Sequence, residues 1–321
     1  MFKPRIRLVL FWAEKGYGED ELDLKIVDLA TVPTLVVPLQ KTLSEEVESR
    51  YKAITESKDI IEFLDKSRSP LSRTHTTSDA PAPSLAPATI AFATASKIIV
   101  EEVHSEAADP NSLFYMSARD DASLKDLAAI ITPSLQGKHQ ALSHHLSEAE
   151  SDNIIVSEKT KVFWRTKKGA VETLLAVFEF ASKPSSELDQ EAQEKRTEYF
   201  NVAKAAWETG LPKVLNKLND EVIGPFALGE QVSIADLHLV AWLARIAKLT
   251  GATASDDGNT VLGKVEEYIG GGYKLPRVVL PVDLMRMDSG NRPVSRSKLA
   301  YLWDTMKERQ SWKKVYAEGL V

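Results

Sequence analysis

Glu56 and Ser57 form the first pattern in the chain that can hold a ligand. The apolar residues that follow them have helical spacing: Ile60, Ile61, Phe63 and Leu64. Ser57 is therefore predicted to cap a helix that begins at this point. The first turn of a helix offers backbone N–H groups without intrahelical partners and the positive end of the helix dipole. A ligand carboxylate can bind there, and a plain helix cap is the simpler interpretation of these two residues taken alone.

A basic run in the middle of the chain surrounds two aromatic residues and can bind an anionic substrate. Its members are Lys159, Lys161, Arg165, Lys167 and Lys168, and they flank Val162-Phe163-Trp164. The simpler interpretation is a solvated helix face. The histidines at positions 139, 144 and 145 lack the i, i+4 spacing of a helical metal pair. Because the chain also has no cysteine, we expect no metal site.

Other motifs with a known chemistry are missing from the sequence. It has neither a glycine-rich phosphate loop nor a Gly-x-Ser-x-Gly nucleophile elbow. His238 lies inside an apolar helical segment, and we interpret it as a hydrogen-bonded core histidine rather than a catalytic base. Several aromatic residues either line an apolar cleft between domains or belong to the core: Phe114, Tyr115, Phe163 and Trp164.

Length and composition limit the class of protein. At 321 residues, 43% of them hydrophobic, the chain is long enough for two globular domains. A net charge of −6 argues against an ordinary nucleic-acid-binding protein. No apolar run approaches the ~20 residues of a membrane span, and no secretory signal is recognisable. We therefore expect a cytoplasmic protein that binds neither nucleic acid nor a membrane.

The elements that must position Glu56 and Ser57 form a small α/β unit at the N-terminus. An amphipathic helix is predicted from about residue 4 to residue 15. Short strands are expected at 24–29, 34–37 and 51–54, and the helix from Ser57 completes the unit. Residues 67–88 are rich in Ser, Thr, Pro and Ala, which is typical of an exposed, extended connector.

Helical periodicity dominates the chain after Thr89. Ser233 and Asp236 have the spacing of a capping box, and Val232 and Leu237 have that of a hydrophobic staple. The helix that they begin is apolar almost all round, so it is predicted to lie in the middle of the core. The predicted helices cover 90–103 (largely buried), a segment from about 124 with a kink or break at Pro133, 158–181, 188–218 (one helix or two), 234–249 and 297–317. Residues 250–272 have a mixed pattern that does not select one type of element.

Five segments resemble the soluble glutathione transferase superfamily, and its fungal members in particular. Arg5-Ile6-Arg7-Leu8-Val9-Leu10 with Glu14-Lys15-Gly16 resembles the first helix of the family's thioredoxin-like domain. Thr31-Val32-Pro33-Thr34-Leu35 resembles its Val-Pro-x-Leu segment, and Thr55-Glu56-Ser57 with the apolar residues that follow resembles its Glu-Ser segment and third helix. The segment 229–237 resembles the folding motif of the helical domain, and 309–315 resembles the terminal helix.

The resemblance implies a glutathione transferase-like fold in three parts. An incomplete α/β thioredoxin-like domain covers residues 1–67, a linker covers 68–88, and a larger all-helical C-terminal domain covers 89–321. The resemblance also implies a cis proline at Pro33, which leaves the N–H and C=O of Val32 available to a bound peptide, as at a strand edge. The implied glutathione contacts are Val32, Pro33, Glu56 and Ser57, and the last two receive the γ-glutamyl carboxylate.

The activity that the resemblance implies is transfer of the glutathione thiol to a small apolar electrophile, as in detoxification, by a cytoplasmic homodimer. The residue that activates the thiol is not identified. Only Met1-Phe2-Lys3-Pro4 precede the first helix, where the family has a strand and its activating Ser, Tyr or Cys, and no spacing selects Tyr17 or Tyr51 instead. Two alternatives stay open: a catalytically inactive ligand-binding or scaffold protein of the same fold, and an interaction domain of the translation-factor type.

Overall fold

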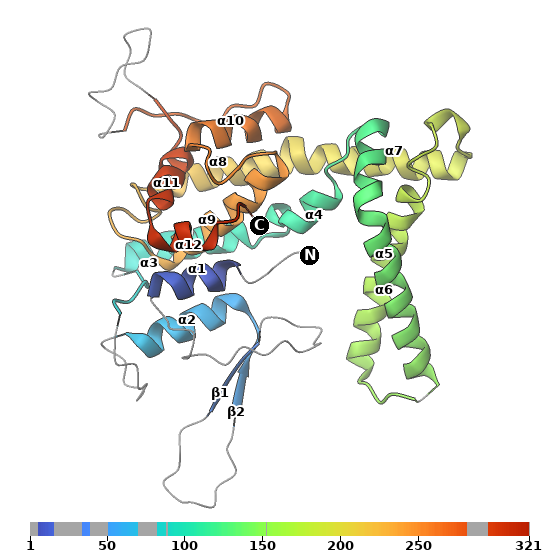
Figure 1. The fold of residues 1–321 in the computed structure, drawn as a ribbon, viewed down its shortest axis with the longest axis horizontal. Coiled ribbons are helices and arrows are strands. Elements are labelled where there is room, and N and C mark those ends of the chain that lie inside the picture. The colour runs from blue at the N-terminus through green and yellow to red at the C-terminus, as the bar shows by residue number, and fades with distance from the viewer. Residues whose placement is uncertain are drawn as a thin grey trace, which may run out of the picture. The chain divides into compact units, whose positions relative to one another are not determined.

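The computed structural model describes residues 6–15, 34–38, 51–69, 82–87, 89–151, 153–280 and 295–320, which are mostly helical with a small antiparallel sheet (Figure 1). The chain forms two compact units. The first combines Met1–Pro110 with Pro212–Val321, and the second is Asn111–Leu211. The first unit thus contains both ends of the chain. The boundaries expected after residues 67 and 88 do not coincide with this division and remain predictions.

The N-terminal part of the first unit has two helices and one pair of strands. The helices are α1 (Ile6–Lys15) and α2 (Ser57–Arg68), and the strands are β1 (Leu35–Pro38) and β2 (Tyr51–Ile54). The strands pair antiparallel, with Leu35 opposite Ile54. Both predicted helices and the last two predicted strands are confirmed to within a few residues. The strand expected at 24–29 lies outside the described residues.

Helix α9 (Ile234–Leu249) is the centre of the first unit, as its sequence predicts. It contacts α1, α3 (Ile90–Val103), α10 (Gly258–Ile269) and α11 (Lys298–Lys307). Nearly all of its residues are buried, because neighbouring helices must cover every face of a helix that is apolar all round. The indole of Trp242 is satisfied inside this core, since its Nε1–H donates to the Ala108 carbonyl at 2.7 Å.

The start of α9 is held by the Asp236 carboxylate, which is completely buried. It accepts hydrogen bonds from the Ser233 N–H at 2.8 Å, the Ser233 hydroxyl at 2.7 Å and the Ala227 N–H at 2.6 Å. The predicted capping box is confirmed, and the bond from Ala227 ties the preceding loop to it. Burial raises the pKa of Asp236 to about 6, although the hydrogen bonds favour the charged form.

A buried ion pair joins α1 to α2. Lys15 Nζ lies 2.9 Å from Asp65 Oδ1, and both side chains are 1% exposed. Lys15 also donates to the carbonyls of Ala82 and Pro83, at 3.3 and 2.6 Å, and Asp65 accepts the Ser84 hydroxyl proton at 2.6 Å. These additional hydrogen bonds matter because two charges are stable away from water only when they are paired and their other polar atoms are satisfied.

Leu85 continues this network to α9. Its N–H donates to Asp65 Oδ1 at 2.9 Å, and its carbonyl accepts the Ile234 N–H, in the first turn of α9, at 3.0 Å. Ser67 and Arg68, at the start of the predicted connector, belong to α2 and are buried, whereas residues 82–87 have no helix or strand, as predicted. The prediction of an exposed connector is nevertheless wrong at Leu85, which is buried because its backbone is bound to two helices.

The second unit is built on α5 (Asp121–Glu150) and α6 (Glu158–Phe178), two long helices that pack antiparallel (Figure 1). Helix α7 (Gln190–Ala205) packs against α6. Helix α5 continues through Pro133 instead of breaking there. Its cap is Asp120, which accepts the Ser123 N–H at 2.8 Å, so the helix begins three residues before the predicted start near residue 124. The apolar core of the unit includes Leu124, Leu127, Ile131, Leu135, Val171, Leu175 and Phe178.

The remaining elements complete the described chain. They are the helices α4 (Pro110–Tyr115), α8 (Leu211–Glu221) and α12 (Gln310–Val315), the 3₁₀ turns η2 (Glu106–Ala108) and η3 (Ser185–Glu187), and the π-helical turn η4 (Ala206–Gly210). None of the described helices combines the length and the apolar character that a membrane crossing requires.

Three predicted helical segments differ from the structure in detail. The helix predicted over 297–317 is two helices, α11 and α12, and the mixed stretch 250–272 contains α10. Helix α12 packs on α1, where the Ser311 hydroxyl donates to Glu14 at 2.8 Å. The N-terminal half of α3 is exposed, with Ile90 at 89%, so the prediction of a largely buried helix holds only from Ser96 onward.

The raised pKa of Asp236 makes the stability of the fold depend on pH. The folded protein protonates this carboxyl below about pH 6, whereas the unfolded chain does so only below about pH 4. Above pH 6 both states are ionised, and the folded state contains a buried charge. As the pH falls from about 6 to about 4, only the folded state takes up the proton. This uptake raises the free energy of unfolding by roughly 2–3 kcal/mol.

Asp236→Asn removes this titration with little change of shape. We expect the free energy of unfolding of the native protein, minus that of Asp236→Asn, to increase when the pH is lowered from about 7 to about 4.5. Urea denaturation at several pH values measures this difference. A difference that stays constant or decreases over the range would contradict the assignment.

Lys15→Met leaves the Asp65 carboxylate buried without its cation. We expect a loss of roughly 3–5 kcal/mol in the free energy of unfolding, and partial recovery when Asp65→Leu is added, because no unpaired charge then remains. Lys66→Met is the matched control on α2, since the Lys66–Glu62 pair is exposed and is worth at most about 1 kcal/mol. A double variant as unstable as Lys15→Met would show that the charge is not the cause.

Candidate functional site

The structure describes two of the four predicted glutathione contacts. Glu56 is the N-cap residue of α2 and Ser57 is the first residue of the helix, so the predicted cap is displaced by one position. Glu56 is exposed, its side chain makes no capping hydrogen bond, and Ser57 is half-buried. Val32 and Pro33 lie outside the described residues, and their contacts remain predictions.

The first turn of α2 has backbone donors in the place where an anion can reach them. The first intrahelical bond runs from the Ile60 N–H to the Glu56 carbonyl at 2.9 Å. The N–H groups of Ser57, Lys58 and Asp59 precede this bond, at the positive end of the helix dipole. The charge of Lys58 favours an anion there, whereas the exposed carboxylates of Glu56 and Asp59 oppose it.

A groove of about 310 Å³ lies between α2 and α3, and Lys58, the neighbour of Ser57, lines it. Residues spaced three or four apart on each helix share the face that borders the groove. The connector and the start of α9 supply the rest of its wall. The lining residues are Lys58, Glu62, Asp65, Lys66, Ala86, Pro87, Ala93, Ser96, Lys97, Val100 and Ile234. The volume is at the lower end of the range for small-molecule sites.

The groove has an excess of positive charge. Three lysines, Lys58, Lys66 and Lys97, stand against two carboxylates, Glu62 and Asp65. Asp65 is already neutralised by its buried partner on α1, and Glu62 lies 4.0 Å from Lys66. A small ligand with at least one anionic group therefore suits this groove better than a cation does.

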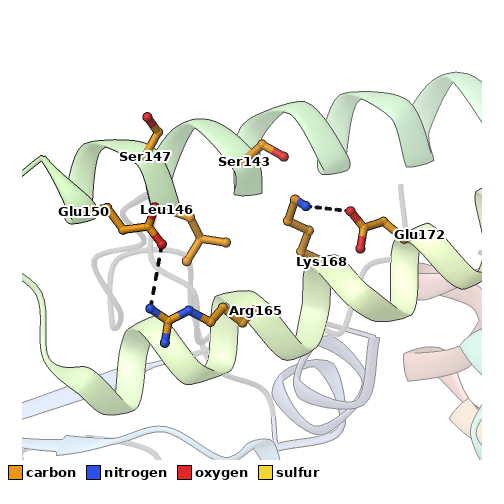
Figure 2. A pocket seen from close by; sticks show the side chains of 7 residues that line it. All are labelled: Ser143, Leu146, Ser147, Glu150, Arg165, Lys168 and Glu172. Carbon is orange, nitrogen blue, oxygen red and sulfur yellow. Dashed lines mark hydrogen bonds and ion pairs between the residues drawn. The ribbon is translucent and has the colours of Figure 1, made fainter.

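The basic run of α6 is divided between two faces of the helix. Lys159 and Lys167 are exposed, and Lys167 Nζ lies 5.6 Å from the centre of the Phe163 ring. Arg165 and Lys168 line a second hollow, of about 420 Å³, between α5 and α6 (Figure 2). The interpretation as a solvated face therefore describes only part of the run.

Contacts with neighbouring side chains explain the positions of most of the candidate histidines. His238 is buried in α9, and its Nδ1 lies 3.0 Å from His104 Nε2, which confirms the interpretation as a hydrogen-bonded core histidine. His139 lies 3.0 Å from Glu172. In the part of the chain that the structure describes, no three His, Asp or Glu side chains are grouped to hold a metal ion.

The remaining aromatic and hydroxyl candidates do not form a catalytic group in the described residues. Phe114 and Tyr115 pack against the core of the second unit, and Trp164 stacks on His145 with ring centres 5.3 Å apart. Tyr17 and the side chain of Tyr51 lie outside the description, so the thiol-activating residue stays unassigned.

The lysines of the groove were not among the site residues predicted from the sequence. Lys58, Glu62 and Lys66 recur every four residues, so the pattern that places them on one face of α2 was present in the sequence. Lys97 belongs to another helix, and no local pattern connects it with α2. Comparison of the chain with protein-family models, curated proteins and solved structures finds no match.

Proposed function

We propose that the chain is a glutathione transferase in which the first turn of α2 receives the γ-glutamyl carboxylate of glutathione. The observation that carries the proposal is the accessible start of α2 directly after β2, with Ser57 in its first turn. The order of β1, β2 and α2 is also the order that a thioredoxin-like domain requires in this part of the chain. A homodimer and a cytoplasmic location belong to the same proposal.

The groove between α2 and α3 supports this function by its composition. Glutathione has two carboxylates and one ammonium group, so an excess of lysines suits it. Ala86, Pro87 and Val100 add apolar surface for an electrophile. A lysine near a thiol lowers the pKa of that thiol, and the thiolate is the nucleophile. We therefore assign Lys58 the role of favouring the thiolate of bound glutathione.

The second candidate is a ligand-binding or scaffold protein without thiol chemistry. It is favoured by the acidic residues at the start of α2, because Glu56 and Asp59 both repel a ligand carboxylate. The two candidates differ in turnover, since only the first predicts a conjugation product.

Calorimetric titration with glutathione tests the role of Ser57. Ser57→Ala is expected to weaken binding by ~1–2 kcal/mol, which is the loss of one hydrogen bond to a charged group. Ser57→Thr keeps the hydroxyl and is expected to retain most of the affinity. Unchanged affinity in Ser57→Ala, with an unchanged unfolding midpoint, would remove Ser57 from the site.

A thiol-conjugation assay on the same protein separates the two candidates. Binding with turnover supports the transferase, and Lys58→Gln should then shift the pH profile of the rate upward, because the bound thiol has a higher pKa without that cation. Binding without turnover supports the ligand-binding protein. If glutathione does not bind, the first turn of α2 is not a glutathione site.

A further inference from the structure

A buried hydroxyl of α3 lines the groove between α2 and α3. Ser96 is only 8% exposed, and it borders the groove. A hydroxyl inside a helix can be satisfied by the carbonyl four residues earlier, as Thr94 is by Ile90 at 3.1 Å. Within the described ranges, the Ser96 hydroxyl makes neither this hydrogen bond nor any other. Because a buried polar group without a partner costs free energy, a ligand that brings an acceptor atom into the groove stabilises it.

One lysine of the same groove lacks a counter-ion. Lys66 lies 4.0 Å from Glu62, and Lys97 lies 3.7 Å from Glu101. Both pairs are exposed and therefore weak. Lys58 makes no ion pair with any part of the chain that the structure describes. An anionic acceptor therefore suits the groove better than a neutral one, since hydrogen bonds to a charged acceptor are stronger and the lysines attract it.

The rest of the lining is mostly apolar and restricts the size of a ligand. Val100 and Ile234 are buried, and Ala86, Pro87 and Ala93 complete the apolar surface. Such a surface favours a ligand whose body is apolar. The volume of about 310 Å³ is at the lower end of the range for small-molecule sites, which suits a single substituted aromatic ring better than a long chain or a fused ring system.

We propose that the electrophile bound in this groove is an aromatic carboxylic acid and not a neutral apolar compound. Its carboxylate accepts the hydrogen bond of the Ser96 hydroxyl and is attracted by the lysines of the groove, of which Lys58 has no other partner. Its ring contacts the apolar surface. Turnover of the acid rests on the proposed function, because glutathione supplies the thiol, whereas binding of the acid does not require glutathione.

The compound 4-chloro-3-nitrobenzoate combines these features with a reactive centre. The glutathione thiolate forms a C–S bond at the carbon that carries chlorine, the C–Cl bond breaks, and chloride leaves with the electron pair. The nitro group stabilises the negative charge that develops on the ring. The carboxylate does not react, so it serves only in recognition. The methyl ester of the same compound lacks the negative charge and is the matched control.

Calorimetric titration without glutathione tests the binding step. We expect 4-chloro-3-nitrobenzoate to bind at least tenfold more tightly than its methyl ester, and its affinity to fall as salt is added. If the ester binds as tightly, or if the acid does not bind at millimolar concentration, the proposal is wrong. This result does not depend on whether the protein binds glutathione.

Three variants locate the carboxylate. Ser96→Ala is expected to weaken binding of the acid about tenfold, through the loss of a hydrogen bond to a charged group, and to affect the ester less. Lys58→Gln should weaken binding of the acid and reduce its dependence on salt. Thr94→Ala removes an exposed hydroxyl of the same helix outside the groove and should leave both affinities unchanged. Unchanged affinity for the acid in Ser96→Ala, with an unaltered thermal unfolding midpoint, would overturn the assignment.

A conjugation assay with glutathione separates this proposal from the proposed function. We expect a higher kcat/KM for the acid than for the ester, each relative to its uncatalysed rate, and Ser96→Ala should remove most of the difference. Preferred conjugation of the ester would contradict the proposal and leave the transferase function standing. If the acid binds as expected and neither compound is conjugated, the transferase function fails, and the groove is a carboxylate site without turnover.

Discussion

The buried pair of Lys15 and Asp65 is the interaction on which the arrangement of the first unit depends. It fixes the end of α1 against α2, and the remaining hydrogen bonds of both side chains hold the connector at residues 82–85. The Leu85 carbonyl then accepts the Ile234 N–H, which links the connector to the first turn of α9. Because a buried charge without its partner is strongly destabilising, α1, α2, the connector and α9 are held in one relative position.

The network of Lys15, Asp65 and the connector holds the walls of the proposed glutathione site in place. Asp65 lines the groove between α2 and α3, but its charge is cancelled from the opposite side by Lys15. Of the groove lysines, Lys66 faces Glu62 and Lys97 faces Glu101, and the positive excess comes from Lys58. The hollow between α5 and α6 is different, since its cations and carboxylates compensate each other along an open surface. The groove between α2 and α3 therefore has a charge excess that favours an anionic ligand, whereas the hollow between α5 and α6 has none.

Local sequence patterns predicted the helices and strands well where their formation depends on interactions between residues close in the sequence. Periodicity placed α1, α3, α6 and α9 to within a few residues, and the spacing of Ser233 and Asp236 predicted a capping box that the structure contains. The predictions differ from the structure where tertiary packing, and not the local sequence, determines helix continuity or burial. Of the two outcomes predicted at Pro133, a kink or a break, the break does not occur, since α5 continues through it. Ile90 is exposed although its segment is apolar, because no described element covers that end of α3.

The sequence by itself determined the helices, the cap of α9 and the face of α2 that carries Lys58, Glu62 and Lys66, because each of these depends on residues within one or two turns. Only the tertiary structure decided that Lys15 meets Asp65, fifty residues away, that Lys97 joins the lysines of α2, and that Lys168 and Glu172 border a hollow with the serines of α5. Such contacts are chosen by the packing of whole helices, which places distant side chains together by geometry and not by their separation along the chain.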